Sequence, residues 1–509
     1  MKRYVALGFV FVAGSLSGGI QACSGGNAEG PGDSGTDVTE LDSGGQHDAS
    51  PDAATDSPPD QGTDSSAEAE AGPPCLQLAV PTPISTERDV LGITTDGYVM
   101  SDVPDGGTNA TPLDGGATTS TGLPANTGFG FAGPLYMVAN NGAFVATWQA
   151  GVLGTGTPLA GGYLAVSSDG QHMVSAGNDG SVTYAKTDMS GQVTLVPAMD
   201  GGAACSAVAG FAGNYLVVAS FACTSAGVPL AATITSYALP SLTPATILTN
   251  AQPFWSADSA GTQVFAMTTG GAASVFPIAG GAGTPIDTNV WSGFMTPDGM
   301  NVLYATTTGQ LKRAATSNPQ PTVLVSSGVY DFPTSFSWES VSSYWLPAQS
   351  PDGSQILTCG SAYCATGGVA FASTTTAGSA TTIVASGGLY GQDAFFDPFT
   401  HDGTYALVRT IQNGVFGASN LIAAKVGGSP QKIATKSSRH FAASTGAKVV
   451  YDENFVDNMG ISDLYVVDLA SSCRTPTLVA SGIDGFWVNA ARDTIVYAQG
   501  GGQFTVPVP

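Results

Sequence analysis

The feature that most restricts what this chain can fold into is a short turn sequence that recurs just before apolar runs. Its clearest copies are TPDGMNVLYA at 296–305, SPDGSQILTCG at 350–360 and THDGTYALVRT at 400–410. Asp-Gly between two apolar runs is a strong hairpin signal, because glycine tolerates positive φ and primed turns match the twist of paired strands. Each copy therefore predicts two antiparallel strands joined at the Asp-Gly.

The same element recurs at intervals of about 30–60 residues, the spacing of a repeat architecture. Further copies are centred on Asp96-Gly97, Asn141-Gly142, Asp169-Gly170, Gly213-Asn214, Gly261, Gly446 and Asp493. A second turn often follows, as at Asn178-Asp179-Gly180, so each unit has about four strands. Each small sheet must cover its faces against its neighbours, and closing into a ring achieves this. The sequence therefore predicts a β-propeller whose Asp-Gly turns join the inner two strands of each blade.

Composition supports an all-β fold class. Only 10% of the residues are charged and 68 are glycine, which is typical of short strands and turns rather than helices. Because some of the turn elements could share a blade, we expect about seven or eight four-stranded blades in a single propeller over residues 75–509.

Three segments carry a family resemblance. SPDGSQIL, TPDGMNVLYA and the later SDLYVVDLAS at 462–471 resemble the WD40-like repeats of TolB-type β-propellers. The resemblance spans roughly residues 85–509 and lacks the Trp-Asp signature of eukaryotic WD40 repeats. It implies a propeller whose partner is another protein of the cell envelope.

The N-terminus has the pattern of an export signal. Lys2 and Arg3 precede an apolar segment that is shorter and richer in glycine than a typical membrane span. Ile20-Gln21-Ala22-Cys23 resembles a bacterial lipobox, in which the cysteine is lipidated and becomes the first mature residue. Residues 1–22 are expected to be a lipoprotein signal peptide and Cys23 a lipid anchor, with the outer membrane implied by Ser24. An ordinary signal peptide with a chance cysteine is the alternative.

Residues 23–74 are expected to be a disordered linker. They consist almost entirely of Gly, Ser, Asp, Pro, Thr and Ala, with 12 acidic residues and no Lys or Arg. Such a segment buries too little apolar surface to offset the entropy of ordering, so it should act as a tether. A calcium-binding run is the alternative, although the carboxylates lack the spacing of known calcium loops.

The ends of the predicted ring suggest how it closes. The last unit, residues 483–509, has room for only three strands, and CLQLAVPTPI at 75–84 is strand-like without a unit of its own. We expect this segment to supply the outer strand of the C-terminal blade, beside residues 484–509.

The remaining cysteines suggest disulfides, because their number is even in a chain with an export signal. Proximity pairs Cys205 with Cys223 and Cys359 with Cys364, and leaves Cys75 with Cys473 at the seam of the ring. Other pairings stay open. A metal site is the competing interpretation, but neither CxxC spacing nor a nearby histidine occurs.

No residue set names a reaction, so we assign no catalytic residue, cofactor or metal. Outside the linker the histidines are His172, His401 and His440, and no GxSxG nucleophile motif occurs. YDENFVDNMGISD at 451–463 gathers oxygen-bearing side chains that could hold Ca²⁺, but a polar hairpin loop has the same composition and is the interpretation we favour. The weak calcium candidates are Asp452, Asn454, Asp457 and Asp463.

The longest insertion, YDFPTSFSWESVSSYW at 330–345, is rich in aromatic residues. Exposed aromatic side chains in a loop could stack on sugar rings or anchor a protein partner. The ligand-binding candidates are Tyr330, Phe336, Trp338, Tyr344 and Trp345. They could instead fill the space between blades, as we expect Trp255, Trp291 and Trp487 to do.

We therefore expect a monomeric cell-envelope lipoprotein whose propeller binds or scaffolds another envelope protein. The alternatives are a carbohydrate-binding or adhesion protein, and a lyase or hydrolase with residues converging at the central channel. The formal net charge of −24 disfavours nucleic acid as a partner, because phosphate binding requires a basic face.

Overall fold

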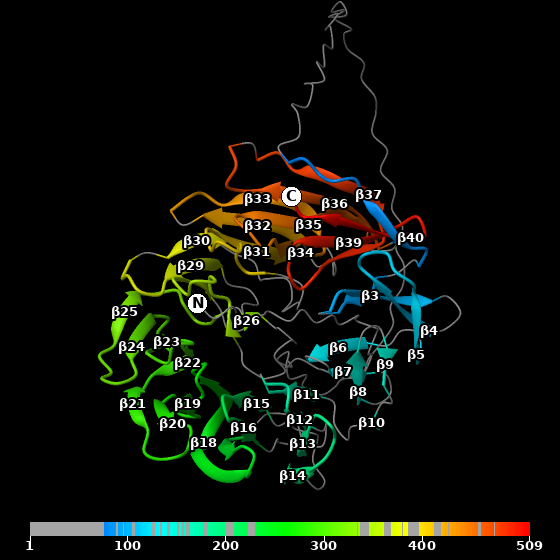
Figure 1. Ribbon diagram of the computed structural model, residues 1–509. Coiled ribbons are helices and arrows are strands. Elements are labelled where there is room, and N and C mark those ends of the chain that lie inside the picture. The colour runs from blue at the N-terminus through cyan, green and yellow to red at the C-terminus, as the bar shows by residue number, and fades with distance from the viewer. Residues whose placement is uncertain are drawn as a thin grey trace, which may run out of the picture. The chain divides into compact units, whose positions relative to one another are not determined.

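The computed structural model describes residues 76–509 except 88–89, 95, 104–106, 125–127, 133–134, 140–142, 150–151, 155–156, 159–162, 168, 177–180, 199–207, 222–229, 333, 336–345, 361–367, 379, 385–396, 412–418, 426, 457–459 and 473. Every regular element in this part of the chain is a β-strand, labelled β1 to β40 (Figure 1). All strand pairings are antiparallel between neighbours. No helix long and apolar enough to cross a membrane occurs among these residues.

The first three sheets are each built from consecutive strands of the chain. They are β2–β5 (Gly92–Ile93, Tyr98–Val103, Gly107–Pro112, Thr119–Pro124), then β6–β10 (Gly128–Ala132, Leu135–Ala139, Ala143–Gln149, Val152–Leu153, Thr157–Pro158), then β11–β14 (Tyr163–Val166, His172–Ala176, Val182–Lys186, Val193–Val196). In the second of them β9 and β10 both pair with β8.

A seven-stranded sheet and a four-stranded sheet follow. The wide sheet holds β15–β21 (Val208–Ala212, Tyr215–Ser220, Ala232–Ala238, Thr243–Ala257, Gln263–Thr268, Ala273–Pro277, Thr284–Asp287), and the next holds β22–β25 (Val290–Met295, Asn301–Thr306, Leu311–Ala315, Thr322–Val325). The 15-residue strand β18 pairs with β17 through its first half and with β19 through its second half. The wide sheet therefore joins two four-stranded units through one shared strand.

The last sheets complete the order. They are β28–β30 (Gln355–Cys359, Val369–Ser373, Thr381–Val384), β31–β33 (Tyr405–Ile411, Ser419–Lys425, Gln431–Ser437), β34–β37 (His440–Ala442, Lys448–Val456, Ile461–Asp468, Thr477–Ile483) and β38–β40 (Gly485–Val488, Thr494–Gln499, Gly502–Pro507) with β1 (Thr82–Ser85). Single bridges, Gln349 to Ile356 and Phe399 to Ala406, add a short inner edge to the two three-stranded sheets.

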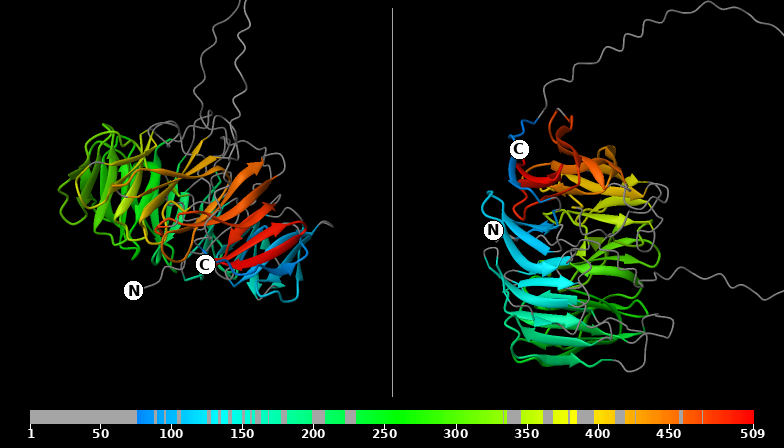
Figure 2. Two further views of the ribbon diagram at one scale, coloured as in Figure 1. Left: turned by 90° about the horizontal axis from the view of Figure 1, so that it is seen from above. Right: turned by 90° about the vertical axis from the view of Figure 1, so that its right-hand side faces the viewer.

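The arrangement is a β-propeller, which confirms the all-β prediction. Seven of the sheets contain four or more strands, in line with the four-stranded blades expected, and the two three-stranded sheets stand beside them in chain order. Consecutive sheets lie next to one another in both Figure 1 and Figure 2, and β2 of the first sheet contacts β38 of the last.

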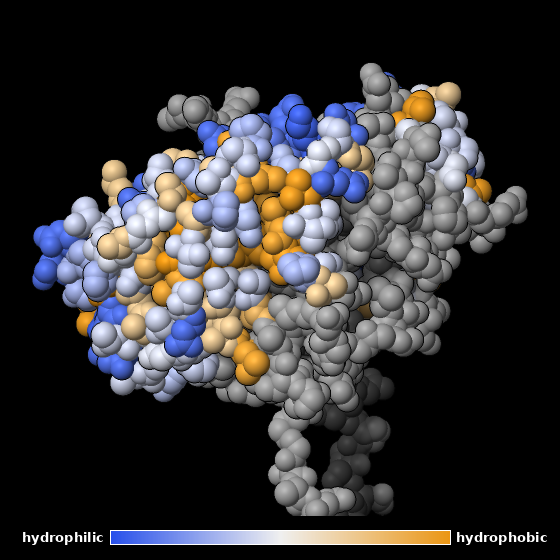
Figure 3. Space-filling model, turned by 90° about the horizontal axis from the view of Figure 1, so that it is seen from below, coloured by the Kyte–Doolittle hydropathy of each residue, from blue (hydrophilic) through white to orange (hydrophobic). Residues whose placement is uncertain are grey.

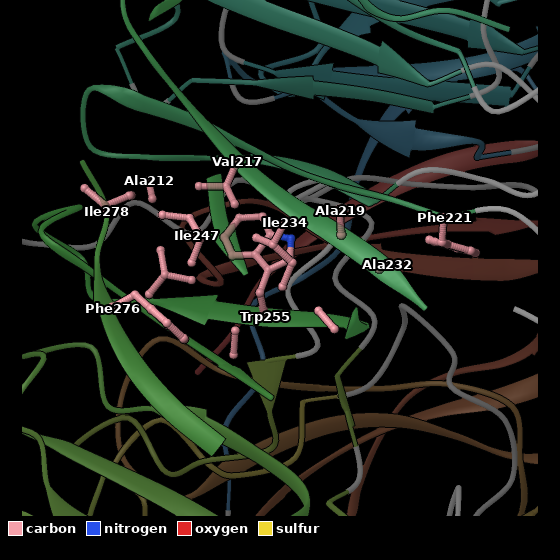
Figure 4. Packing of buried hydrophobic residues seen from close by; sticks show 13 residues of the cluster. Ala212, Val217, Ala219, Phe221, Ala232, Ile234, Ile247, Trp255, Phe276 and Ile278 are labelled. Carbon is pink, nitrogen blue, oxygen red and sulfur yellow. The ribbon is translucent and has the colours of Figure 1, made fainter. Parts of the chain in front are cut away.

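The hydrophobic core is divided into slabs between neighbouring sheets. One slab packs Val217 and Ile234 against Ile247, Trp255 and Phe276 across the two halves of the wide sheet (Figure 4). Further slabs join the following pairs of sheets in the same way. Because each sheet buries apolar side chains on both faces, its central strands are continuous apolar runs such as VLYA at 302–305.

The ring closes where the sequence predicted. Residues 82–85 of β1 pair antiparallel with β40 as the outer strand of the last sheet. Ile84 packs with Ile93 and Val99 of the first sheet and with Trp487 of the last, and the Trp487 indole N–H donates to the Val90 carbonyl at 2.7 Å. Residues from the first and last strands of the propeller therefore share one core slab.

The Asp-Gly turns lie mostly where the propeller prediction placed them. Asp298-Gly299 joins β22 to β23, and corresponding turns join the first two strands of other sheets, at Asp96, Asp169, Gly213, Gly446 and Asp493. The turn at Gly261 joins β18 to β19 within the wide sheet. Asp352 and Asp402 each follow a short inner bridge. The exception is Asn141-Gly142, which lies outside the described residues between β7 and β8, the second and third strands of their sheet.

Turns of neighbouring sheets also contact one another. The Ser259 amide donates to the Pro297 carbonyl at 2.8 Å, the Asp402 amide to Gly446 at 3.3 Å and the Ser444 amide to Arg492 at 2.9 Å. The Asp-Gly turns therefore stabilise the contact between sheets as well as the hairpin within each sheet.

Candidate interaction surface

The aromatic insertion begins at an ordered position. Tyr330 is 42% exposed, and its amide donates to the Cys359 carbonyl at 2.8 Å, which ties the insertion to the end of β28. Phe332 is buried, with its ring edge-on to Phe294 at 5.4 Å between centroids. The short strands β26 (Thr334–Ser335) and β27 (Leu346–Pro347) pair across the base of the insertion.

The structure therefore places only one of the five predicted ligand-binding residues. Tyr330 is exposed, as a binding residue should be, while Phe336, Trp338, Tyr344 and Trp345 lie outside the described residues and remain predictions.

The three tryptophans expected between blades do not behave alike. Trp255 and Trp487 are buried in slabs between sheets, as predicted. The prediction is wrong for Trp291, which is 45% exposed. The register of β22 against β23 shifts between Val290 and Ser292, so Trp291 is the extra residue of a β-bulge. A bulge re-aims side chains, and periodicity alone does not reveal one.

Apolar residues reach the surface elsewhere too, as the orange strips among hydrophilic residues in Figure 3 show for one face. Trp291 and Tyr330 are the aromatic members of the exposed large apolar side chains in the described part of the chain. They are therefore the strongest surface anchors that can be placed.

The alternative prediction, a lyase or hydrolase, requires several titratable side chains close together at one point. The described residues contain one such cluster, near the inner strands of the last three sheets. The His440 ring nitrogen Nε2 lies 3.1 Å from the Asp397 carbonyl, and the Asp397 carboxylate accepts from the Ala442 amide at 2.7 Å and pairs with Arg492. Arg409 is buried beside this group and donates to the Ser419 hydroxyl at 2.8 Å and to the Ser437 carbonyl at 3.2 Å.

The charge state of His440 fits a structural role for this cluster better than a catalytic one. Burial and then the Arg409 charge lower the pKa of His440 to about 3. At neutral pH the ring is therefore uncharged and a weak base, whereas a general base works best with a pKa near the operating pH. His172 begins β12 and His401 lies in the turn before β31, and the His172 Nδ1 is 2.7 Å from the Tyr184 hydroxyl.

The weak calcium candidates are not gathered at one point. Asp452 is buried, and its carboxylate accepts from the backbone amides of Ser438 and Arg439, each at 2.8 Å. In β36, Asp463 lies opposite Glu453, the neighbour of Asp452, so Asp452 and Asp463 project from opposite faces of the sheet. Asn454 donates to Asp463 at 3.1 Å, and Asp457 lies outside the described residues. No group of three or more potential metal ligands occurs among the residues that were described.

Of the predicted disulfide cysteines the structure describes only Cys359, which is buried at the end of β28 and is disulfide-bonded. Cys75, Cys205, Cys223, Cys364 and Cys473 lie outside the described residues, as does the lipidation candidate Cys23. The predicted pairings therefore remain predictions.

Comparisons with known proteins add little. No known family matches the sequence, and no curated protein matches it. Among solved structures, the crystal structure of a eukaryotic initiation factor is similar with a TM-score of 0.46 and 13% identity, covering 69% of this chain and 88% of that one. BamB from Moraxella catarrhalis is similar with a TM-score of 0.34 and 12% identity, covering 67% and 95%.

The tricorn protease is similar over 83% of this chain and 45% of that chain, with a TM-score of 0.30 and 11% identity. At these values the likenesses carry no argument about function. What this chain does has to be argued from its own residues.

Proposed function

We propose that this chain is a lipid-anchored protein of the cell envelope, with a propeller that holds another envelope protein as its partner. The observation that carries the proposal is the closure of the ring by β1. Because β1 begins at Thr82 and belongs to the last sheet, the chain enters the closed propeller at an outer strand, and in the sequence this strand comes after Cys23 and the acidic segment 23–74. That order is the order of an anchor, a tether and a binding module.

The anchor follows from the sequence. Several acyl chains on one cysteine give stable membrane attachment, where a single chain gives marginal binding. A linker of about 50 residues spans roughly 40 Å as a flexible coil, and its carboxylates repel one another and extend it further. The proposed location is the outer membrane, with the propeller held off the lipid surface as a monomer.

A binding role suits the propeller better than catalysis. Its turns contact one another from sheet to sheet, so they form a rigid frame that presents loops. The converging titratable group around His440 is buried, and its histidine is a weak base at neutral pH. Two exposed aromatic side chains, Trp291 and Tyr330, are of the kind that anchor ligands at binding surfaces.

We also propose that disulfides strengthen the ring. Cys359 would pair with Cys364, Cys205 with Cys223, and Cys75 with Cys473, the last of these next to the seam that β1 closes. Mass spectrometry of the non-reduced peptides tests these pairs directly, and a different connectivity would overturn them.

The anchor is tested by acyl labelling and fractionation of the full-length protein. Wild type should incorporate a labelled fatty acid and sediment with the membrane fraction, whereas Cys23→Ala should do neither while keeping a folded propeller. Equal labelling of both forms would contradict the anchor. Cross-linking in cells then tests the partner, as described at the end of the Discussion.

A further inference from the structure

Trp291 is held at the surface by the backbone around it. The bulge at Trp291 directly follows Val290, whose amide donates to the Gly271 carbonyl at 3.0 Å. Gly271 has φ +80°, and a Cβ there would lie 2.9 Å from the Val290 carbonyl oxygen. Only glycine permits this approach without strain. The turn between β19 and β20 thus supports the strand that presents the indole.

Tyr330 is supported in the same way by a second glycine. Gly309 has φ +78°, and a Cβ there would lie 3.2 Å from Cζ of the Tyr330 ring. The Val329 amide donates to the Gly309 carbonyl at 2.9 Å, which holds the segment before Tyr330 against the turn between β23 and β24. Both exposed aromatic residues therefore have defined positions.

The two aromatic residues belong to one continuous stretch of surface. The turn that carries Gly309 also contains Thr307, whose amide donates to the Asn289 carbonyl at 3.0 Å, two residues before Trp291. We call the exposed residues of this stretch the Trp291 patch, defined by Thr288, Asn289, Trp291, Thr307, Thr308 and Tyr330.

The Trp291 patch is uncharged. Segments 269–272, 288–291, 307–310 and 326–330 contain no charged residue and are rich in threonine, serine and glycine. At its border, Asp287 pairs with Lys312 at 2.9 Å and accepts the Tyr304 hydroxyl at 2.9 Å. The Asp287 carboxylate is therefore compensated by a cation, and the carboxylate of Asp331, next to Tyr330, accepts the Phe332 amide at 2.9 Å.

We propose that the Trp291 patch binds a neutral glycan. A sugar ring presents C–H groups on one face and hydroxyl groups around its edge. The indole of Trp291 and the phenol ring of Tyr330 offer flat apolar surfaces for the C–H face. Asn289, Thr307 and Thr308 offer uncharged donors and acceptors for the hydroxyl groups, and such groups fix orientation in a binding site.

The chemistry of the patch favours this ligand over other classes. A nucleic acid or an acidic glycan would need a compensating cation, and the patch has none. A protein partner could use the same two aromatic residues, and the experiment separates that case. The inference does not depend on the proposed envelope partner, because it concerns a different ligand and a defined surface.

The test is binding of the purified full-length protein to an array of neutral and acidic oligosaccharides, followed by titration of the best neutral ligand. Wild type should bind one or more neutral glycans, and it should bind no acidic analogue more tightly than the corresponding neutral glycan. Trp291→Ala should weaken binding at least about tenfold, because losing a large aromatic anchor costs more than about 1.4 kcal/mol. Tyr330→Ala should weaken it by a smaller factor of about three to ten.

Leu478→Ala is the matched control, since Leu478 is similarly exposed, at 47%, on a different sheet. It should leave glycan binding unchanged, and thermal melting should show that all three variants remain folded. Gly309→Ala gives an independent check, because it should displace Tyr330 and weaken binding without removing an aromatic ring.

Two results would overturn the proposal. One is the absence of binding to every neutral glycan at millimolar concentration. The other is a Trp291→Ala variant that binds glycan like wild type or that loses an envelope protein in cross-linking instead, which would assign the patch to a protein partner.

Discussion

The hydroxyl of Thr296 donates to the carboxylate of Asp298 at 2.6 Å. Both side chains also accept hydrogen bonds from backbone amides of the turn that leads into β23. Asp298 accepts the Met300 amide at 2.9 Å, and the Thr296 oxygen accepts the Asn301 amide at 3.0 Å. Gly299, with φ +70°, completes the turn. These contacts satisfy backbone donors that would otherwise be left open at the hairpin.

The same arrangement recurs around the propeller. A hydroxyl residue stands two places before the aspartate in Thr94/Asp96, Ser167/Asp169, Ser350/Asp352 and Thr400/Asp402, with the hydroxyl donating to the carboxylate in each. The repeat is therefore Ser/Thr-x-Asp-Gly, and the hydroxyl is as much a part of it as the Asp-Gly.

Replacing Thr296 with Val should destabilise the fold by about 1–2 kcal/mol, because the Asn301 amide loses its acceptor while the volume is kept. Thr322→Val is the control, since Thr322 is exposed in β25, where valine fits a strand. Urea unfolding monitored by tryptophan fluorescence compares the two. Equal effects would show that the hydroxyl of Thr296 is not needed.

Gly299 and Gly353 occupy the same turn position with nearly equal φ, +70° and +69°, and differ in their surroundings. A Cβ at Gly299 would lie 2.9 Å from Asp258 Cβ of the neighbouring turn, whereas nothing lies within 4 Å at Gly353. Gly353→Ala should cost about 1–2 kcal/mol from backbone strain alone. Gly299→Ala should cost distinctly more in the same unfolding assay. A Gly353 variant that loses as much or more would contradict the close contact between turns.

Ile84 joins the two ends of the chain, so truncating it should weaken the closed ring. Ile84→Ala should cost about 2–4 kcal/mol, the range for buried aliphatic side chains. Val80→Ala should change stability by less than about 0.5 kcal/mol, because Val80 is 87% exposed just before β1. Thermal melting of both variants measures the difference. No shift for Ile84→Ala would mean that β1 does not contribute to the fold.

Acid should destabilise the protein through two kinds of group, a buried histidine and the turn aspartates. Burial and then the Arg409 charge lower the pKa of His440 from 6.5 to about 3. Between these two pH values His440 is protonated in the unfolded chain and neutral in the folded chain. The free energy of unfolding therefore decreases as the pH falls from about 6.5 toward 3. His440→Gln should flatten stability against pH in that range, as thermal melting at a series of pH values would show.

The turn aspartates act at lower pH. The Ser350 hydroxyl and then the Ser354 amide hold the pKa of Asp352 below its usual 3.8. The carboxylate is thus favoured in the folded state, so its contribution is present above about pH 4 and disappears as the pH falls below that. Asp352→Asn should reduce the loss of stability as the pH falls below about 4, as unfolding measured at a series of pH values would show. An unchanged profile would show that this carboxylate is not stabilised by folding.

Much of the fold could be predicted because local chemistry and ring closure agree. The Asp-Gly turns predict hairpins from local sequence. The strand-like segment ending at Ile84 belonged to no repeat unit, and the last unit was one strand short, so the segment was predicted to complete the last sheet. The shared strand β18 could not be predicted, because its 15 residues show no turn to separate the two units that it joins.

The surface was harder to predict than the fold. The exposure of Trp291 arises from a one-residue bulge, and a bulge reverses the face on which the following residues lie. The burial of His440 depends on three sheets that meet, which no single segment encodes. A signal for the Trp291 patch was present in the sequence as short uncharged runs, TTGG, TNVW and TTTGQ, each at the end of a strand.

The most direct test of the central proposal is cross-linking in cells of the tagged full-length protein, followed by mass spectrometry of what is captured. We expect reproducible capture of one or two cell-envelope proteins, and reduced capture for Cys23→Ala, which should no longer be held at the membrane. An empty capture from a protein that is folded and associated with the membrane would contradict the partner-binding role.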